Sequence, residues 1–144
     1  MCLAVYVVSS EMLREIPWDD SKRLFHLESV THEEGFWKWL KRRQVYYAGT
    51  HMRCGCGYQK GNAKPEQYAS IQANYVALSE VVREAVERGA NVEVVACFSE
   101  LASATPEITG EILSADIRRA EFEFKEGQHF RVVSRRGAAR TSGS

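Results

Sequence analysis

The feature that most constrains the fold is a long amphipathic helix expected after residue 65. From Tyr68 onward, apolar residues recur at steps of three and four, and charged side chains occupy the rest of the helix surface. Pro65 suits the first turn of such a helix, and Gly89 suits its left-handed end. The apolar stripe consists of Ile71, Tyr75, Leu78, Val82 and Val86.

Two β-prone segments flank this helix, at residues 45–50 and 92–98. A strand, a helix and a second strand in this order predict a βαβ unit with parallel strands and a right-handed crossover. The near-continuous apolar run at residues 2–8 is typical of a central strand covered on both faces, and residues 24–30 are a further expected strand. The sequence therefore predicts an α/β fold with a mixed sheet around a central βαβ unit.

The C-terminal part predicts an antiparallel hairpin. Phe122 and Phe124 alternate with charged residues, residues 126–128 form the connection, and Phe130 and Val132 lie on the returning strand. Residues 1–134 are expected to form a single domain. Residues 135–144, which are rich in Arg, Gly, Ser and Ala, are expected to form a disordered tail.

Shorter elements are expected between these. Residues 11–16 suit a helical turn that ends at Pro17, and Ser114 suits the cap of another helical turn. Thr31 and Glu34 have the spacing of a capping box, which predicts a short helix ending in the basic residues 41–43.

Composition excludes several function classes. The 144 residues carry a formal net charge of zero, which gives no general attraction to nucleic acid or to an anionic membrane. The first apolar stretch is too short to span a bilayer, and no basic region precedes it. Four cysteines are too few for a secreted disulfide framework in a chain of this length, so a reducing cytoplasm is the expected compartment.

One loop carries residues suited to chemistry. His51, Cys54 and Cys56 lie among glycines directly after an expected strand, at the carboxyl edge of the sheet where α/β proteins place their sites. Cys97 lies near the end of the next strand of the βαβ unit, so it is expected to approach the loop. One imidazole and three thiols suit a transition metal, and we expect Zn(II) or Cu(I) bound by His51, Cys54, Cys56 and Cys97.

The spacing leaves other functions open, because a single residue between two cysteines is not typical of zinc sites. Cys54 and Cys56 also suit a reversible disulfide in a thiol redox or regulatory module. A cysteine nucleophile with His51 as base is a further alternative, as is anion binding by the glycine N–H groups with Lys60 and Lys64. Two further alternatives are that the cysteines have no function of their own and that the chain is a non-enzymatic interaction protein.

The motif His51-Met-Arg-Cys54-Gly-Cys56-Gly-Tyr58, together with the opening Met-Cys-Leu-Ala-Val-Tyr and the stretch Ile-Pro-Trp at residues 16–18, resembles a group of small bacterial proteins. That group shares a His-x-x-Cys-Gly-Cys-Gly-aromatic motif and has no established activity. The resemblance covers most of the chain up to residue 133. It implies that the loop is a family pattern, and it implies no reaction.

The expected partner is a small molecule or a protein of unknown identity, and exposed aromatic surface suggests a homodimer. The remaining histidines carry weaker expectations. His26 and His32 are expected to face solvent, and His129 has no obvious partner in the sequence.

Overall fold

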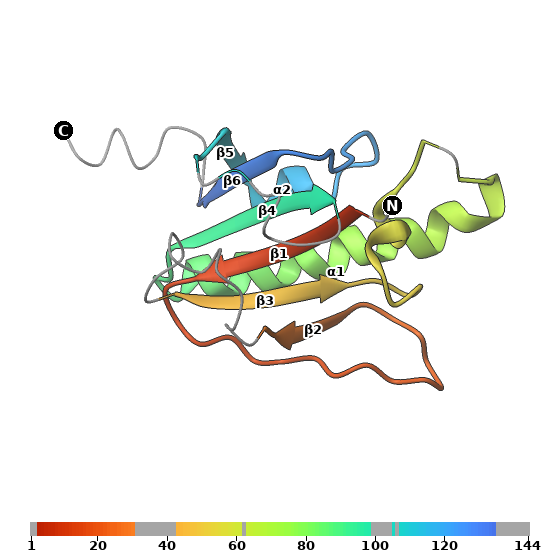
Figure 1. The fold of residues 1–144 in the computed structure, drawn as a ribbon, viewed down its shortest axis with the longest axis horizontal. Helices are drawn as coiled ribbons and strands as arrows, with labels where there is room; N and C mark the ends of the chain where they lie inside the picture. Colours follow the sequence, from red (N-terminus) through yellow and green to blue (C-terminus); the bar gives the residue numbers. More distant parts are fainter. Residues whose placement is uncertain (1–2, 31–42, 62, 99–104, 106, 135–144) are drawn as a thin grey trace.

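Six strands form one mixed sheet in the order β2-β3-β1-β4-β6-β5, and a long helix crosses one face of it (Figure 1). The computed structural model describes residues 3–30, 43–61, 63–98, 105 and 107–134. The strands are β1 (Leu3–Ser9), β2 (His26–Ser29), β3 (Gln44–Gly49), β4 (Val92–Phe98), β5 (Gly110–Leu113) and β6 (Gln128–Val133). The helices are α1 (Tyr68–Glu87), α2 (Ser114–Ile117) and the 3-10 turns η2 (Gly55–Tyr58) and η3 (Pro65–Gln67). The predicted α/β class, mixed sheet and long helix are confirmed.

Strand β1 is the centre of the sheet because all of its residues are apolar or small and all are buried. Leu3, Val5 and Val7 face the core under α1, whereas Ala4 and Tyr6 face a second cluster on the opposite side of the sheet. β1 runs antiparallel to both β3 and β4. β3 and β4 are therefore parallel, as the βαβ prediction requires, but they are not neighbours, since β1 lies between them.

Helix α1 buries the predicted stripe against the sheet. Ile71, Tyr75, Leu78 and Val82 are all buried in the core cluster. The helix ends at Glu87, and Gly89 follows it with a φ of 96°, in the left-handed region that glycine adopts without strain. The Ala90 N–H then donates to the Ala85 carbonyl at 3.0 Å, which closes the helix end.

The predicted C-terminal hairpin is wrong. Residues 122–125 form no strand, and β6 instead pairs antiparallel with β4 and parallel with β5. The alternation of Phe122 and Phe124 has another cause, because both rings pack against Tyr75 of α1, with ring centroids 5.8 and 5.5 Å away. The pattern thus reflects packing on a helix rather than a half-buried strand.

Two shorter predictions also need correction. Residues 11–16 form no helical turn, and Ile16 instead exchanges two backbone hydrogen bonds with Leu27 of β2, at 2.9 and 2.8 Å. The turn at 114–117 is helical as expected, but the Asp116 carboxylate caps it by accepting from the Leu113 N–H. The predicted helix before residue 43, His32, Cys2 and the tail at 135–144 lie outside the described residues.

Within the described part of the chain, no helix is both long enough and apolar enough to cross a membrane.

Candidate functional site

The cysteine loop follows β3 and folds back through η2 on the α1 side of the sheet. The side chain of Thr50, the residue after β3, hydrogen-bonds to the backbone of the loop. Its hydroxyl donates to the Cys54 carbonyl and accepts from the Met52 N–H. The Arg53 N–H donates to the Thr50 carbonyl at 2.8 Å. Arg53 has a left-handed φ of 69°, and its guanidinium lies 5.4 Å from the centre of the Trp18 ring. The loop is therefore a defined turn with its own hydrogen bonds.

Gly55 lets this loop approach the central strand. A Cβ atom at this position would lie 1.2 Å from the carbonyl oxygen of Leu3 in β1. Only a residue without a side chain can occupy this place, so Gly55 fixes the backbone between the two cysteines.

Asn74 of α1 holds His51 in place. The Asn74 Oδ1 accepts from the His51 backbone N–H at 3.2 Å, and its Nδ2 donates to the Gly57 carbonyl at 3.1 Å. These backbone partners determine which amide atom is which. The Nδ2 group also lies 2.8 Å from His51 Nδ1, and an amide NH₂ can only donate there. The neutral His51 ring therefore carries its proton on Nε2.

The electrostatics agree with a neutral ring. Burial lowers the pKa of His51 below its usual value of 6.5. With its basic Nδ1 accepting from Asn74, the neutral ring offers Nε2–H as a hydrogen-bond donor to its surroundings. This tautomer also argues against metal binding by His51. Nδ1 already accepts a hydrogen bond from Asn74, and binding a metal through Nε2 would require the Nε2 proton to move to Nδ1.

The two loop cysteines are half-buried thiols. Cys54 precedes η2, and Cys56 lies within it. Cys56 and His51 line the same cavity of about 160 Å³, together with side chains from the loop and from the start of α1. The structure thus places His51, Cys54 and Cys56 on one hydrogen-bonded turn, and His51 and Cys56 line the same cavity.

Cys97 does not join them. Its side chain is fully buried among Ala4, Tyr6 and Val95, on the face of the sheet away from α1. It does lie near the carboxyl edge expected from the topology, but strand alternation turns its thiol to the opposite face from the loop. Among the described residues, no group of three or more His, Cys, Asp and Glu side chains is placed to hold a metal ion. The four-ligand set expected from the sequence is not assembled in this structure.

Lys60 is also engaged elsewhere. Its ammonium donates to the carbonyls of Arg119 and Ala120, at 3.3 and 2.8 Å, and lies 4.5 Å from the centre of the Tyr75 ring. Its hydrogen-bonding capacity is therefore used within the protein rather than offered to an anion.

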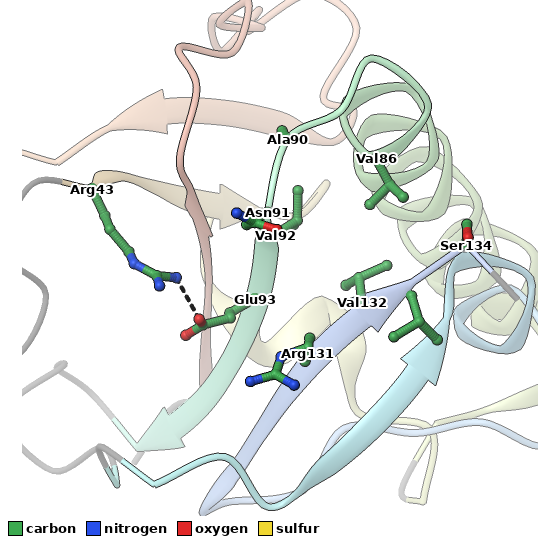
Figure 2. Close-up of a pocket in the computed structure, with 10 residues that line it drawn as sticks. Arg43, Val86, Ala90, Asn91, Val92, Glu93, Arg131, Val132 and Ser134 are labelled. Carbon is green, nitrogen blue, oxygen red and sulfur yellow. Dashed lines mark hydrogen bonds and ion pairs between the residues drawn. The ribbon is translucent and has the colours of Figure 1, made fainter. Parts of the chain in front are cut away.

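A second polar cluster, which no sequence motif indicates, lies on the other face of the sheet. His129 Nε2 lies 2.6 Å from the Glu93 carboxylate, and its Nδ1 lies 3.0 Å from the Thr105 carbonyl. Arg43 pairs with the other oxygen of Glu93 beside a cavity of about 480 Å³ (Figure 2). The signal was a single acidic residue within the apolar run of β4.

This cluster joins strands rather than forming a reactive centre. The hydrogen bond from His129 lowers the pKa of Glu93 despite its partial burial, and the charge of Arg43 lowers it further. Arg131, which also lines the cavity, lies 3.8 Å from Glu111. Because each of these charges has a counter-charge, the cluster is better suited to holding β4, β6 and Arg43 together than to binding a ligand.

The expectation that His26 faces solvent is wrong. The ring is 2% exposed, its Nδ1 lies 2.8 Å from Glu28, and its Nε2 has no hydrogen-bond partner among the described residues. The reason is Gly49 on the neighbouring strand, where a Cβ would lie 1.9 Å from His26 Nε2. The His26 ring therefore packs against the backbone of Gly49 on one side. On the other side it contacts the Trp18 ring, with the two ring centroids 5.2 Å apart.

Comparisons with protein-family models, with curated proteins and with solved structures found no match to this chain.

Proposed function

We propose that the loop is a thiol redox module in which Cys54 and Cys56 form a reversible disulfide. The observation that carries this proposal is the conformation of Gly55, the residue between them, which opens η2. A helical residue brings the Cα atoms on either side of it to about 5.5 Å. Disulfides need Cα atoms roughly 4.4–6.8 Å apart, and this spacing meets that requirement. Side chains two residues apart on a helical turn do not face each other, so forming the bond also requires the loop backbone to adjust at Cys54 or Cys56.

Two further features support the proposal. Both thiols are partly exposed, which a disulfide partner in solution requires, whereas Cys97 is fully buried. The backbone around them is anchored to β1 at Gly55 and to α1 at Asn74. Two cysteines separated by one residue on an anchored turn have a high effective concentration for each other, which favours the intramolecular bond over links between molecules.

His51 is assigned the role of a donor. Its Nε2–H lies on a ring that lines the same cavity as Cys56. During exchange, negative charge develops on the attacking and leaving sulfur atoms, and a neutral N–H donor beside Cys56 stabilises that charge. The assignment excludes His51 as the general base that the nucleophile hypothesis requires.

The reaction tested is exchange with glutathione disulfide. One loop thiolate attacks the glutathione disulfide and releases one glutathione, and the second loop thiol displaces the other. Two thiols and one disulfide become one protein disulfide and two glutathione molecules, with both thiol protons passing to the products or solvent.

The experiment equilibrates the protein in glutathione buffers of graded potential and counts free thiols by alkylation and mass spectrometry. We expect the wild type to lose two thiols together, without mass gain from glutathione, and to regain them with a reductant. Cys54→Ser and Cys56→Ser should instead carry one bound glutathione, whereas Cys97→Ala, the control, should behave as wild type. Loop thiols that stay free, or that form only links between molecules, would end the proposal.

Metal content distinguishes the remaining alternative. Soft thiolates favour Cu(I), and the loop still offers a pair of them. Elemental analysis of protein purified without added metal or chelator should find less than about a tenth of an equivalent of Zn or Cu. Stoichiometric metal that disappears in Cys54→Ala would favour the metal function over the redox one.

A further inference from the structure

A cleft of about 620 Å³ lies beside the cysteine loop, between α1 and residues 22–25. Small-molecule sites in proteins usually measure roughly 300–1,000 Å³ and are mostly apolar with a few polar groups. This cleft has that character. Its apolar lining comes from Ile16, Leu24, Phe25, Ala69, Ala73 and Ala77.

The space exists because one face of α1 carries small side chains. Ala69, Ala73 and Ala77 are four residues apart and so lie on the same side of the helix. Across from them, Leu24 and Ile16 keep 58% and 38% of their surfaces exposed. Large apolar side chains left in solvent around a concave surface favour an apolar occupant.

The charged side chains that line the cleft are both cationic. Lys22 and Arg23 line it, and within the described ranges no carboxylate lies at ion-pair distance from either. Asp19 and Asp20 are not among the residues that line the cleft. Hydrogen bonds from Ser21 lower the pKa of Asp19, and the charge of nearby Lys22 lowers it further.

Arg23 also sits in a costly backbone conformation. Its φ of 50° is left-handed, which costs a non-glycine residue about 1–2 kcal/mol. The Arg23 Nε donates to the Asp20 carbonyl at 3.4 Å, which leaves the two NH₂ groups of the guanidinium for an anion in the cleft.

His51 adds a donor to the same lining. The ring lines both this cleft and the smaller cavity that contains Cys56. Because Asn74 occupies Nδ1, the ring offers Nε2–H as its remaining polar group. The polar part of the cleft therefore consists mainly of donors, which suits an acceptor group on a ligand.

We propose that the cleft binds a small monocarboxylate with an apolar body. The apolar part lies against the alanine face of α1 with Leu24 and Phe25, and the carboxylate is held by Lys22 and Arg23. This site goes beyond the proposed thiol function and does not depend on it, since no cysteine lines the cleft.

The test titrates the full chain with octanoate, octan-1-ol and acetate, followed by amide chemical shifts in NMR spectra. We expect octanoate to shift the amides of residues 22–25 and of 69–77, and to bind about tenfold more tightly than octan-1-ol. Acetate, which has the charge without the apolar body, should bind more weakly than both.

Two variants assign the halves of the site. Lys22→Gln combined with Arg23→Gly should weaken octanoate about tenfold and leave octan-1-ol unchanged, whereas Lys125→Gln, an exposed charge elsewhere, should change neither. Ala73→Leu should fill the cleft and abolish binding of both, while Ala73→Ser, which hardly alters the volume, should keep it. Ala73 is solvent-exposed, so neither change disturbs the core.

Three results would overturn the proposal: no shifts in the cleft at 10 mM octanoate, equal binding of octanoate and octan-1-ol, or unchanged binding in Ala73→Leu. The double variant Cys54→Ser with Cys56→Ser separates the two proposals. It should lose glutathione-linked oxidation and keep octanoate binding, so the failure of one function can be recognised without the other.

Discussion

At the scale of single residues, glycine and asparagine determine the geometry of the cysteine loop. Gly55 lies against the Leu3 carbonyl, and Asn74 fixes both the loop backbone and the His51 tautomer. Neither contributes reactive chemistry. A Cβ at residue 55 would displace the loop from β1, and a hydrogen-bond acceptor in place of the Asn74 amide would move the His51 proton to Nδ1.

Gly55→Ala is predicted to destabilise the fold by about 3 kcal/mol, because its methyl group must displace backbone and not a flexible side chain. Urea denaturation measures this. Gly61→Ala is the matched control, since a Cβ there meets nothing closer than 3.9 Å and should change stability by less than about 0.5 kcal/mol. Similar losses in the two variants would contradict the close approach at Gly55.

Asn74→Asp is predicted to raise the pKa of His51 and to move its proton to Nδ1. A carboxylate accepts at that nitrogen where the amide donates, and its charge favours the imidazolium. Ring ¹⁵N chemical shifts during an NMR pH titration report both properties. The wild type should show the Nε2–H tautomer with a pKa below 6.5, in keeping with its burial. An Nδ1–H tautomer in the wild type would refute the donor role of His51.

At the scale of elements, Tyr75 links α1 to η2 and to residues 122–125, which belong to no helix or strand. Its hydroxyl donates to the Tyr58 carbonyl at 2.5 Å and accepts from the Phe124 N–H at 3.1 Å. Its ring stacks on Phe124, and Tyr58 packs edge-on against it. Burial raises the pKa of Tyr75 well above its usual value, so this hydroxyl stays protonated and keeps donating.

Tyr75→Phe is predicted to cost about 2–3 kcal/mol, because it leaves a buried carbonyl and a buried N–H without their partner. Tyr68→Phe is the control on the same helix, since Tyr68 is 47% exposed and should lose less than about 0.5 kcal/mol. Chemical denaturation of both variants measures the difference. Hydrogen exchange should also become faster at the Phe124 amide in Tyr75→Phe only.

At the scale of the whole molecule, the sheet carries two chemically different faces. The α1 face holds the main apolar core and the cysteine loop, and the other face holds the smaller cluster with Cys97 and the Glu93–His129 pair. That pair joins β4 to β6, and β4 is the strand on which both halves of the sheet depend, because it also pairs with β1.

The free energy of unfolding at acid pH should depend on the Glu93–His129 pair. The pKa of Glu93 is lowered in the folded state, so its stabilising effect is complete above its unfolded value of 4.5 and is lost as the pH falls through the folded value. Urea midpoints measured from pH 7 to pH 3 should show a large deficit for Glu93→Gln at pH 7 that shrinks toward pH 3. Glu84→Gln, on the exposed surface of α1, should follow the wild type throughout. A constant deficit for Glu93→Gln would rule out this linkage.

The sequence by itself determined the elements whose pattern is long and local. The stripe of α1, its end at Gly89 and the strands at β1, β3 and β4 follow from hydrophobic periodicity and turn residues, which act within neighbouring turns of the chain. The loop with His51, Cys54 and Cys56 was identified in the same way, because its residue types lie together in the sequence.

Only the tertiary structure decided which strands are neighbours, which face of the sheet each side chain occupies, and which residues it contacts. Insertion of β1 between β3 and β4, the turning of Cys97 away from the loop, and the pairing of Asn74 with His51 join residues far apart in the chain. Such contacts depend on where whole elements pack against each other. A shift of one residue in the pairing register of a strand also moves every side chain to the opposite face of the sheet. Local sequence patterns therefore do not specify these long-range contacts.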